Sequence, residues 1–88
     1  MLDEAWSLAP GVALRPEPFG ALAYHFGNRR LTFLKRPELV AVVRALGDSS
    51  TVRVALASSG VTEAHFPAYL TALKGLAEAD MIRPRNLP

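Results

Sequence analysis

The chain has 88 residues, of which half are hydrophobic and a fifth are charged, and it contains no cysteine. This length allows one small domain with a core of modest size, and the residue balance is that of a folded chain. The lack of cysteine excludes disulfides, thiolate nucleophiles and cysteine-ligated metals. No apolar run approaches the length of a membrane span and the first ten residues carry no basic segment, so we expect a soluble, cytoplasmic protein.

Positive charge is concentrated in one short segment. The formal net charge is only +2, but residues 29–36 hold four basic side chains and no acid. A solvated charge cluster and a binding site for an acidic partner both fit this pattern. The cluster consists of Arg29, Arg30, Lys35 and Arg36.

The first half of the chain predicts three strands. Residues 12–15 form a short strand that ends before two prolines, which cannot donate to a sheet ladder. Residues 20–26 and 29–35 form two more strands around Gly27-Asn28, a pair typical of a two-residue type II′ hairpin turn.

This turn fixes the register of the hairpin, with Leu22 opposite Phe33 and Tyr24 opposite Leu31. These residues, together with Phe26, give the hairpin an apolar face. We expect the other face to be mostly solvated. That face carries Ala21, Ala23, His25, Arg30, Thr32 and Leu34.

The second half predicts three helices. The first begins at Pro37 and stops at Gly47, and the second runs from a cap at Ser50 or Thr51 to about Ala57. The third follows Thr62, and because Pro67 falls late for a first-turn proline, residues 63–66 form either a separate turn or an irregular first turn. Its apolar stripe consists of Phe66, Tyr69, Leu70, Leu73, Leu76 and Ala77.

Three strands followed by three helices predict an α+β fold. The order β-β-β-α-α-α, with a three-stranded antiparallel sheet placed first, is that of a small winged helix-turn-helix domain. We expect this single domain to cover residues 1–82 and residues 83–88 to form a flexible C-terminal tail.

Catalytic motifs are missing from the sequence. It has two histidines and no HExxH, P-loop, GxGxxG or paired carboxylates, so we expect neither an enzyme nor a metal site. The helix order makes a winged-helix DNA-binding regulator an alternative. Against it, the exposed positions of the third helix include Glu63 and Glu78, whose carboxylates would repel phosphate.

The strand from Arg30 to Lys35 has two interpretations. Charged residues and a flanking proline protect the edge of a sheet from unwanted pairing. The same edge can also bind an extended peptide by strand addition, and its basic ends would then attract an acidic peptide.

A resemblance bears on this choice. The segment "VALRPEPFGALAYHFGNRRLTFLKRPELVAVVRAL", residues 12–46, closely resembles the peptide chaperones of mycofactocin biosynthesis. The segment "GVTEAHFPAYLTALKGLAEADMI", residues 60–82, continues the likeness. This family is related to the pyrroloquinoline quinone biosynthesis chaperone. It is also related to the wider group of precursor recognition elements that act on ribosomally made, post-translationally modified peptides (RiPPs).

The resemblance implies a non-enzymatic, cofactor-free domain that binds the leader region of a short, acidic precursor peptide as an added strand. It also implies that the domain presents this peptide to a radical S-adenosylmethionine enzyme, with no nucleic acid or membrane as partner. A DNA-binding regulator and a structural subunit of an enzyme complex stay as alternatives. The peptide-binding residues that the resemblance and the charge pattern imply are Arg29, Arg30, Leu31, Thr32, Phe33, Leu34, Lys35, Arg36, Phe66, Tyr69, Leu70 and Leu73.

Overall fold

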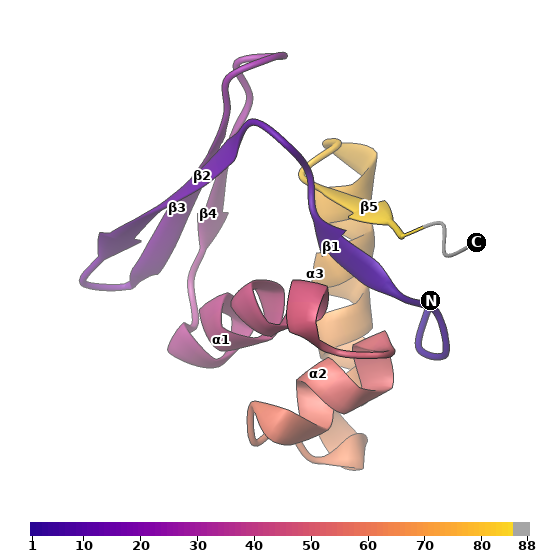
Figure 1. Cartoon of the computed structure of the whole chain (residues 1–88). Coiled ribbons are helices and arrows are strands. Elements are labelled where there is room, and N and C mark those ends of the chain that lie inside the picture. The colour runs from indigo at the N-terminus through magenta and orange to yellow at the C-terminus, as the bar shows by residue number, and fades with distance from the viewer. Residues whose placement is uncertain (86–88) are drawn as a thin grey trace.

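The computed structural model describes residues 1–85 and has the predicted α+β architecture, with a sheet on one side and three helices on the other (Figure 1). The sheet is antiparallel and has the order β2-β3-β4. Its strands are β2 (Val12–Glu17), β3 (Gly20–His25) and β4 (Leu31–Leu34). The helices are α1 (Pro37–Ala45), α2 (Val52–Ser58) and α3 (Phe66–Glu78), so the predicted β-β-β-α-α-α order is confirmed for these elements.

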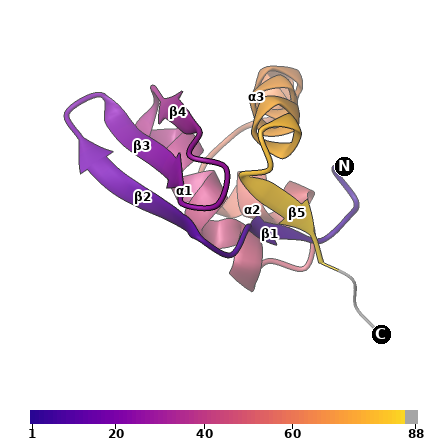
Figure 2. The same cartoon turned by 90° about the horizontal axis from the view of Figure 1, so that it is seen from above.

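A second, two-stranded sheet joins the two ends of the described chain. Strand β1 (Trp6–Leu8) pairs antiparallel with β5 (Ile82–Pro84), and both lie beside α3 on the side away from the larger sheet (Figures 1 and 2). The expected C-terminal tail therefore contributes two residues, Arg83 and Pro84, to a strand. Its last three residues, 86–88, lie outside the described part. Strands of three residues give no alternating pattern, which is why the sequence did not predict this pair.

The hairpin register is confirmed. Leu22 lies opposite Phe33 and Tyr24 lies opposite Leu31, as the pattern predicts. On the other side of β3, Leu14 of β2 lies opposite Ala23.

The prediction of which hairpin face is solvated is wrong. Ala21, Ala23 and His25 are buried, as is Leu34, whereas Phe33 is 58% exposed. Small alanine side chains let the helices approach this face closely, which the larger residues of the opposite face would prevent. The apolar side chains of β2 join the same inner face through the β2–β3 register, which the single strands did not reveal.

The two-residue hairpin turn is also wrong. His25 and Arg30 close a loop of four residues, 26–29, through a bond of 3.0 Å from the His25 N–H to the Arg30 carbonyl. The residue in the left-handed region is Arg29, with a φ of 62°, whereas a type II′ turn needs a positive φ at Gly27. The Arg29 N–H donates to the carbonyl of His25 at 2.7 Å.

The helix boundaries follow local chemistry. Pro37 opens α1, and a 3₁₀ turn, η1 (Leu46–Asp48), ends it. Thr51 caps α2, because its Oγ1 accepts from the Val54 N–H at 3.2 Å. A separate 3₁₀ turn, η2 (Glu63–His65), precedes α3, which confirms one of the two predicted solutions for Pro67.

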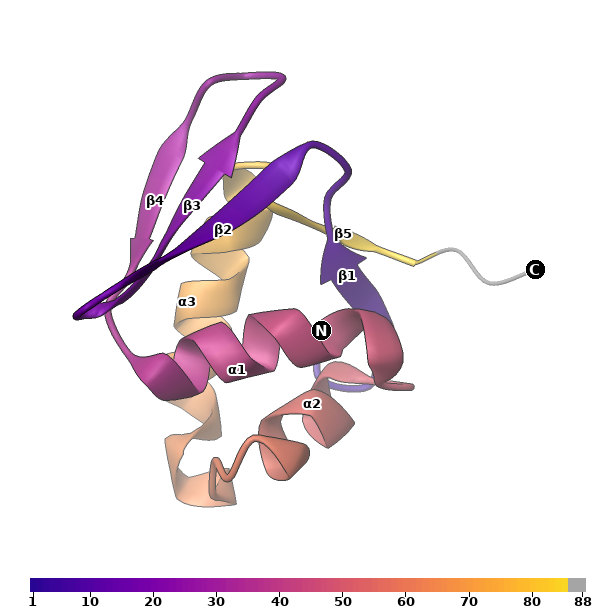
Figure 3. The same cartoon turned by 60° about the vertical axis from the view of Figure 1, so that its left-hand side comes forward.

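The core lies between the inner sheet face and the three helices, with α1 crossing beneath the strands (Figure 3). Helix α3 contributes Phe66, Tyr69, Leu73 and Leu76 to it. Within residues 1–85, none of the helices is long and apolar enough to cross a membrane.

Candidate functional site

Strand β4 is an edge strand, because β3 is its only pairing partner among the described residues. The His25 N–H bonds to the carbonyl of Arg30, and bonded and non-bonded pairs alternate along an antiparallel ladder. Thr32 is therefore bonded to β3, while Leu31 and Phe33 direct their N–H and C=O groups away from the sheet. Within the described part of the chain, every second residue of this edge therefore presents an unpaired backbone donor and acceptor.

A groove of about 410 Å³ runs between this edge and α3. Figure 2 shows β4 as the strand of the sheet nearest α3. The groove combines an apolar floor with basic groups from the end of β4. Its lining residues are Phe33, Lys35, Arg36, Leu39, His65, Ala68, Tyr69 and Ala72.

A second hollow of about 290 Å³ continues the groove past the end of β4. It shares Arg36, His65 and Tyr69 with the first and reaches the turn between α2 and α3 at Gly60. The His65 ring is oriented by a contact of 3.0 Å between its Nδ1 and the Oγ1 of Thr62. Together the two hollows border β4 and the residues that follow it, from Phe33 to Glu38.

The basic cluster occupies both ends of this edge. Arg29 lies in the hairpin loop and Arg30 closes it, while Lys35 and Arg36 follow β4. All four side chains are exposed, and none of them makes an ion pair within residues 1–85. Their positive charge is thus available to a partner.

The predicted strand residues divide between two faces. Leu31 is 55% exposed and Phe33 is exposed to a similar degree, whereas Leu34 is 1% exposed and packs in the core. Thr32 is half-buried on the inner side. An added strand would therefore contact the backbone of the whole edge but the side chains of only some of these residues.

The predicted helix residues are placed differently from one another. Tyr69 lines the groove, but Phe66 and Leu73 are buried in the core. Leu70 is half-buried and does not line the groove. Helical periodicity identifies the buried stripe, and the groove lies along the border of that stripe. The groove residues that the prediction missed are Leu39, His65, Ala68 and Ala72.

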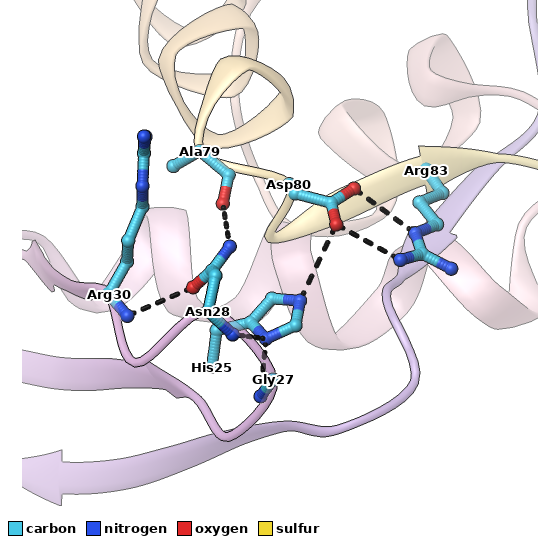
Figure 4. A network of polar contacts seen from close by, with 7 residues as sticks. All are labelled: His25, Gly27, Asn28, Arg30, Ala79, Asp80 and Arg83. Carbon is cyan, nitrogen blue, oxygen red and sulfur yellow. Dashed lines mark hydrogen bonds and ion pairs between the residues drawn. The ribbon is translucent and has the colours of Figure 1, made fainter.

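A polar network attaches the hairpin loop to the end of α3 (Figure 4). Nδ1 of the buried His25 accepts from the N–H groups of Gly27 at 2.9 Å and Asn28 at 3.2 Å. The Asn28 side chain accepts from the Arg30 N–H at 2.9 Å and donates to the carbonyl of Ala79 at 3.2 Å. The loop that contains Arg29 and ends at Arg30 is thereby held against the end of α3.

Asp80 completes the network. Its carboxylate lies 3.6 Å from Nε2 of His25 and accepts two hydrogen bonds from the Arg83 guanidinium, at 3.0 and 3.1 Å (Figure 4). The hydrogen bonds and the charge of Arg83 hold the pKa of Asp80 below its ordinary value. The carboxylate is therefore ionised at neutral pH, and His25 faces a negative charge.

Comparison with known proteins identifies the family of the chain that forms this edge and groove. The model of the peptide chaperone MftB family matches residues 5–83. The chain belongs to this family. The curated relative from Mycobacterium tuberculosis, "Peptide chaperone MftB", is 49% identical over 84 residues, which cover 96% of this chain and 77% of the relative. The family resemblance seen in residues 12–46 and 60–82 is confirmed.

Two further relatives of the same name support this membership. The protein from Mycobacterium ulcerans is 49% identical over 96% of this chain and 77% of its own length. The protein from Mycolicibacterium smegmatis is 48% identical over 96% of this chain and 82% of its own length. No solved structure matches the chain significantly.

Proposed function

We propose that this chain is a non-enzymatic peptide chaperone. It binds the leader region of an acidic precursor peptide as a strand added to β4, and it presents that peptide to a radical S-adenosylmethionine enzyme. One observation carries the proposal. Among residues 1–85, the edge of β4 has no pairing strand on its outer side, borders an apolar groove and has basic side chains without an ion pair at both ends.

Main-chain hydrogen bonds would supply the peptide's general affinity. The outward N–H and C=O groups of Leu31 and Phe33 match those of an extended chain in either direction. Each such bond contributes about 0.5–1.5 kcal/mol net. The groove side chains add apolar contacts and select among peptides that all share the same backbone.

The basic cluster would select acidic peptides. Each exposed ion pair contributes about 0.2–1 kcal/mol and weakens with salt. A basic pair at each end of the edge also raises the association rate with an acidic peptide. The pairs are Arg29 with Arg30 and Lys35 with Arg36. This accounts for a basic edge strand without an acid among its residues.

The delivery step rests on family membership and resemblance. The relatives are named peptide chaperones, and the resemblance to the mycofactocin family implies a modifying enzyme as the recipient. A cytoplasmic location, where such an enzyme and its peptide would meet, remains a prediction from the sequence.

DNA binding is the less favoured function. A recognition helix needs basic or amide groups toward the major groove. Helix α3 contributes one cation, Lys74, and it also carries Glu78. The basic cluster lies on the hairpin and the β4–α1 junction instead.

The test is calorimetric titration of the folded chain with the leader segment of an acidic precursor peptide. The Phe33→Pro variant removes one outward N–H without removing a β3–β4 bond, and Phe33→Ala is the matched control that keeps the N–H. We expect the proline variant to bind at least about fivefold more weakly than the alanine variant, since one lost backbone bond is worth about 1 kcal/mol. Equal affinities in two folded variants, as judged by circular dichroism, would contradict strand addition.

A further inference from the structure

The outer face of the sheet carries an apolar cluster that the helices do not cover. We call Phe19, Leu31 and Phe33 the outer-face cluster; their exposed fractions are 40%, 55% and 58%. The rings of Phe19 and Phe33 meet edge to face, with centroids 5.7 Å apart. Beside them is a shallow hollow of about 340 Å³, lined by Phe19, Phe33 and Lys35.

The position of Phe19 follows from the close approach of the β2–β3 turn to the end of β4. Gly20 has a φ of +150°, and a Cβ on it would lie 2.1 Å from the carbonyl oxygen of Leu34. Only glycine therefore allows the turn between β2 and β3 to lie this close to the end of β4. The close approach brings Phe19, the residue before Gly20, beside Phe33.

The hollow is continuous with the proposed peptide site. Phe33 lines both the groove beside α3 and the outer hollow, and Lys35 does the same. In an antiparallel or parallel pair, residues directly opposite each other place their side chains on the same face of the sheet. Peptide residues opposite Leu31 and Phe33 would consequently point to the outer face, and their sequence neighbours would point toward α3.

We propose that Phe19 and Phe33 form a second peptide subsite, which accepts an apolar side chain of the bound acidic peptide on the outer face of the sheet. Phe19 is then a specificity-determining residue, although it lies outside the edge strand and the groove. This inference rests on the proposed function, because it requires a peptide strand on β4.

The subsite predicts a pattern in the peptide. The positions opposite Leu31, Phe33 and Lys35 are two residues apart from one another. Apolar partners suit the first two and an acid suits the third. The recognised segment accordingly reads apolar, any residue, apolar, any residue, acid, or the same pattern reversed.

The experiment titrates the same acidic precursor peptide into the wild-type chain and into the Phe19→Ala and Phe26→Ala variants. Phe26 is the matched control, because it is an exposed phenylalanine that packs against Tyr24 and lines neither the hollow nor the groove. We expect Phe19→Ala to weaken binding by about fivefold to twentyfold, as truncation of an aromatic anchor does, and Phe26→Ala to change it less than twofold. Equal effects of the two substitutions, or no effect of Phe19→Ala, would overturn the subsite and leave strand addition intact.

Peptide variants, combined with the protein variants, test the same point. Replacing the peptide's apolar residues with alanine, one at a time, should reveal a position whose loss is coupled to Phe19→Ala in a double-mutant cycle. Any further position coupled to Leu31→Ala should lie two residues away. Coupling of Phe19 to no position in a peptide that binds would overturn the subsite, and a wild-type chain that binds no peptide would overturn the proposed function itself.

Discussion

Nε2 of His25 lies 3.6 Å from a carboxylate oxygen of Asp80, and this contact joins the hairpin loop to the segment that follows α3. The other ring nitrogen, Nδ1, accepts hydrogen bonds from two backbone N–H groups, so the ring carries its proton on Nε2. The buried histidine thus serves as the hydrogen-bond acceptor for the loop. The His25 ring therefore helps to hold the loop that contains Arg29.

Replacing His25 with phenylalanine tests this role. The ring volume is kept, but the N–H groups of Gly27 and Asn28 lose their acceptor. We expect the free energy of unfolding to fall by about 1–3 kcal/mol, the cost of leaving buried or part-buried donors unpaired. Urea denaturation measures it.

A glycine in the same loop provides an independent check. A Cβ on Gly27 would lie 2.8 Å from Cε1 of His25. Gly27→Ala should therefore also destabilise the chain, and it should do so much less in the His25→Ala background. Additive losses in this double-mutant cycle would show that the two residues do not act together.

The Asp80–Arg83 ion pair predicts a pH dependence of stability. The pKa of Asp80 is lowered in the folded chain, mainly by the Arg83 hydrogen bonds, so the pair stabilises the fold at neutral pH. This contribution is lost as the pH falls below the ordinary value of 3.8 and through the lowered pKa.

The matched variant is Asp80→Asn, which keeps the shape of the side chain. We expect it to unfold at a lower temperature than the wild type near neutral pH. The difference should disappear at a pH below the lowered pKa, where Asp80 is protonated in both states. A difference that is equally large in acid would mean that the charge is not its cause.

The fold was predictable where a sequence pattern is compatible with one structure only, as it is for the hairpin register. The hairpin register was correct although the loop was wrong, because a two-residue and a four-residue loop with the same centre pair the same residues, such as Leu22 with Phe33. The loop length was not predictable, because it depends on contacts of the His25 ring with the loop and with Asp80 in the segment after α3. No local sequence pattern indicates these contacts.

The buried face of the hairpin was not predictable from the two strands alone. Both faces carry apolar residues, and the larger ones, such as Phe33, are exposed. The packing of α1 against β3 and β4 favours the small side chains Ala21 and Ala23. The candidate site was half predictable for the same reason: the edge strand and its charges are local features, whereas the groove residues come from α1, η2 and α3.

The basic hairpin loop predicts a charge-dependent affinity. Arg29→Gln and Arg30→Gln together should weaken binding of the acidic precursor peptide about twofold to thirtyfold, at about 0.2–1 kcal/mol for each exposed charge. The loss should shrink at high salt, because screening already weakens the wild-type attraction. Calorimetric titration at two salt concentrations measures both effects.

Arg44→Gln is the control for net charge. Arg44 is an exposed arginine in the last turn of α1 and does not line the groove. If it weakens peptide binding as much as either loop substitution, the chain attracts the peptide through overall charge and not through the basic ends of β4.

Replacing Gly20 with alanine and replacing Gly75 with alanine should change the stability of the chain in opposite directions. A Cβ on Gly20 would meet the carbonyl oxygen of Leu34 at 2.1 Å and the backbone nitrogen of Arg36 at 3.3 Å, while nothing lies within 4 Å of a Cβ on Gly75. Gly20→Ala should therefore destabilise the chain by about 2 kcal/mol or more, because the β2–β3 turn must move away from the end of β4.

Gly75→Ala should instead stabilise the chain by about 0.5–1 kcal/mol, since alanine is favoured over glycine inside a helix. Thermal unfolding of both variants measures whether each substitution raises or lowers the stability.

A folded Gly20→Ala variant should additionally lose the contact between Phe19 and Phe33, and its affinity for the precursor peptide should fall toward that of Phe19→Ala. Wild-type affinity in that variant would separate the position of the turn from peptide recognition.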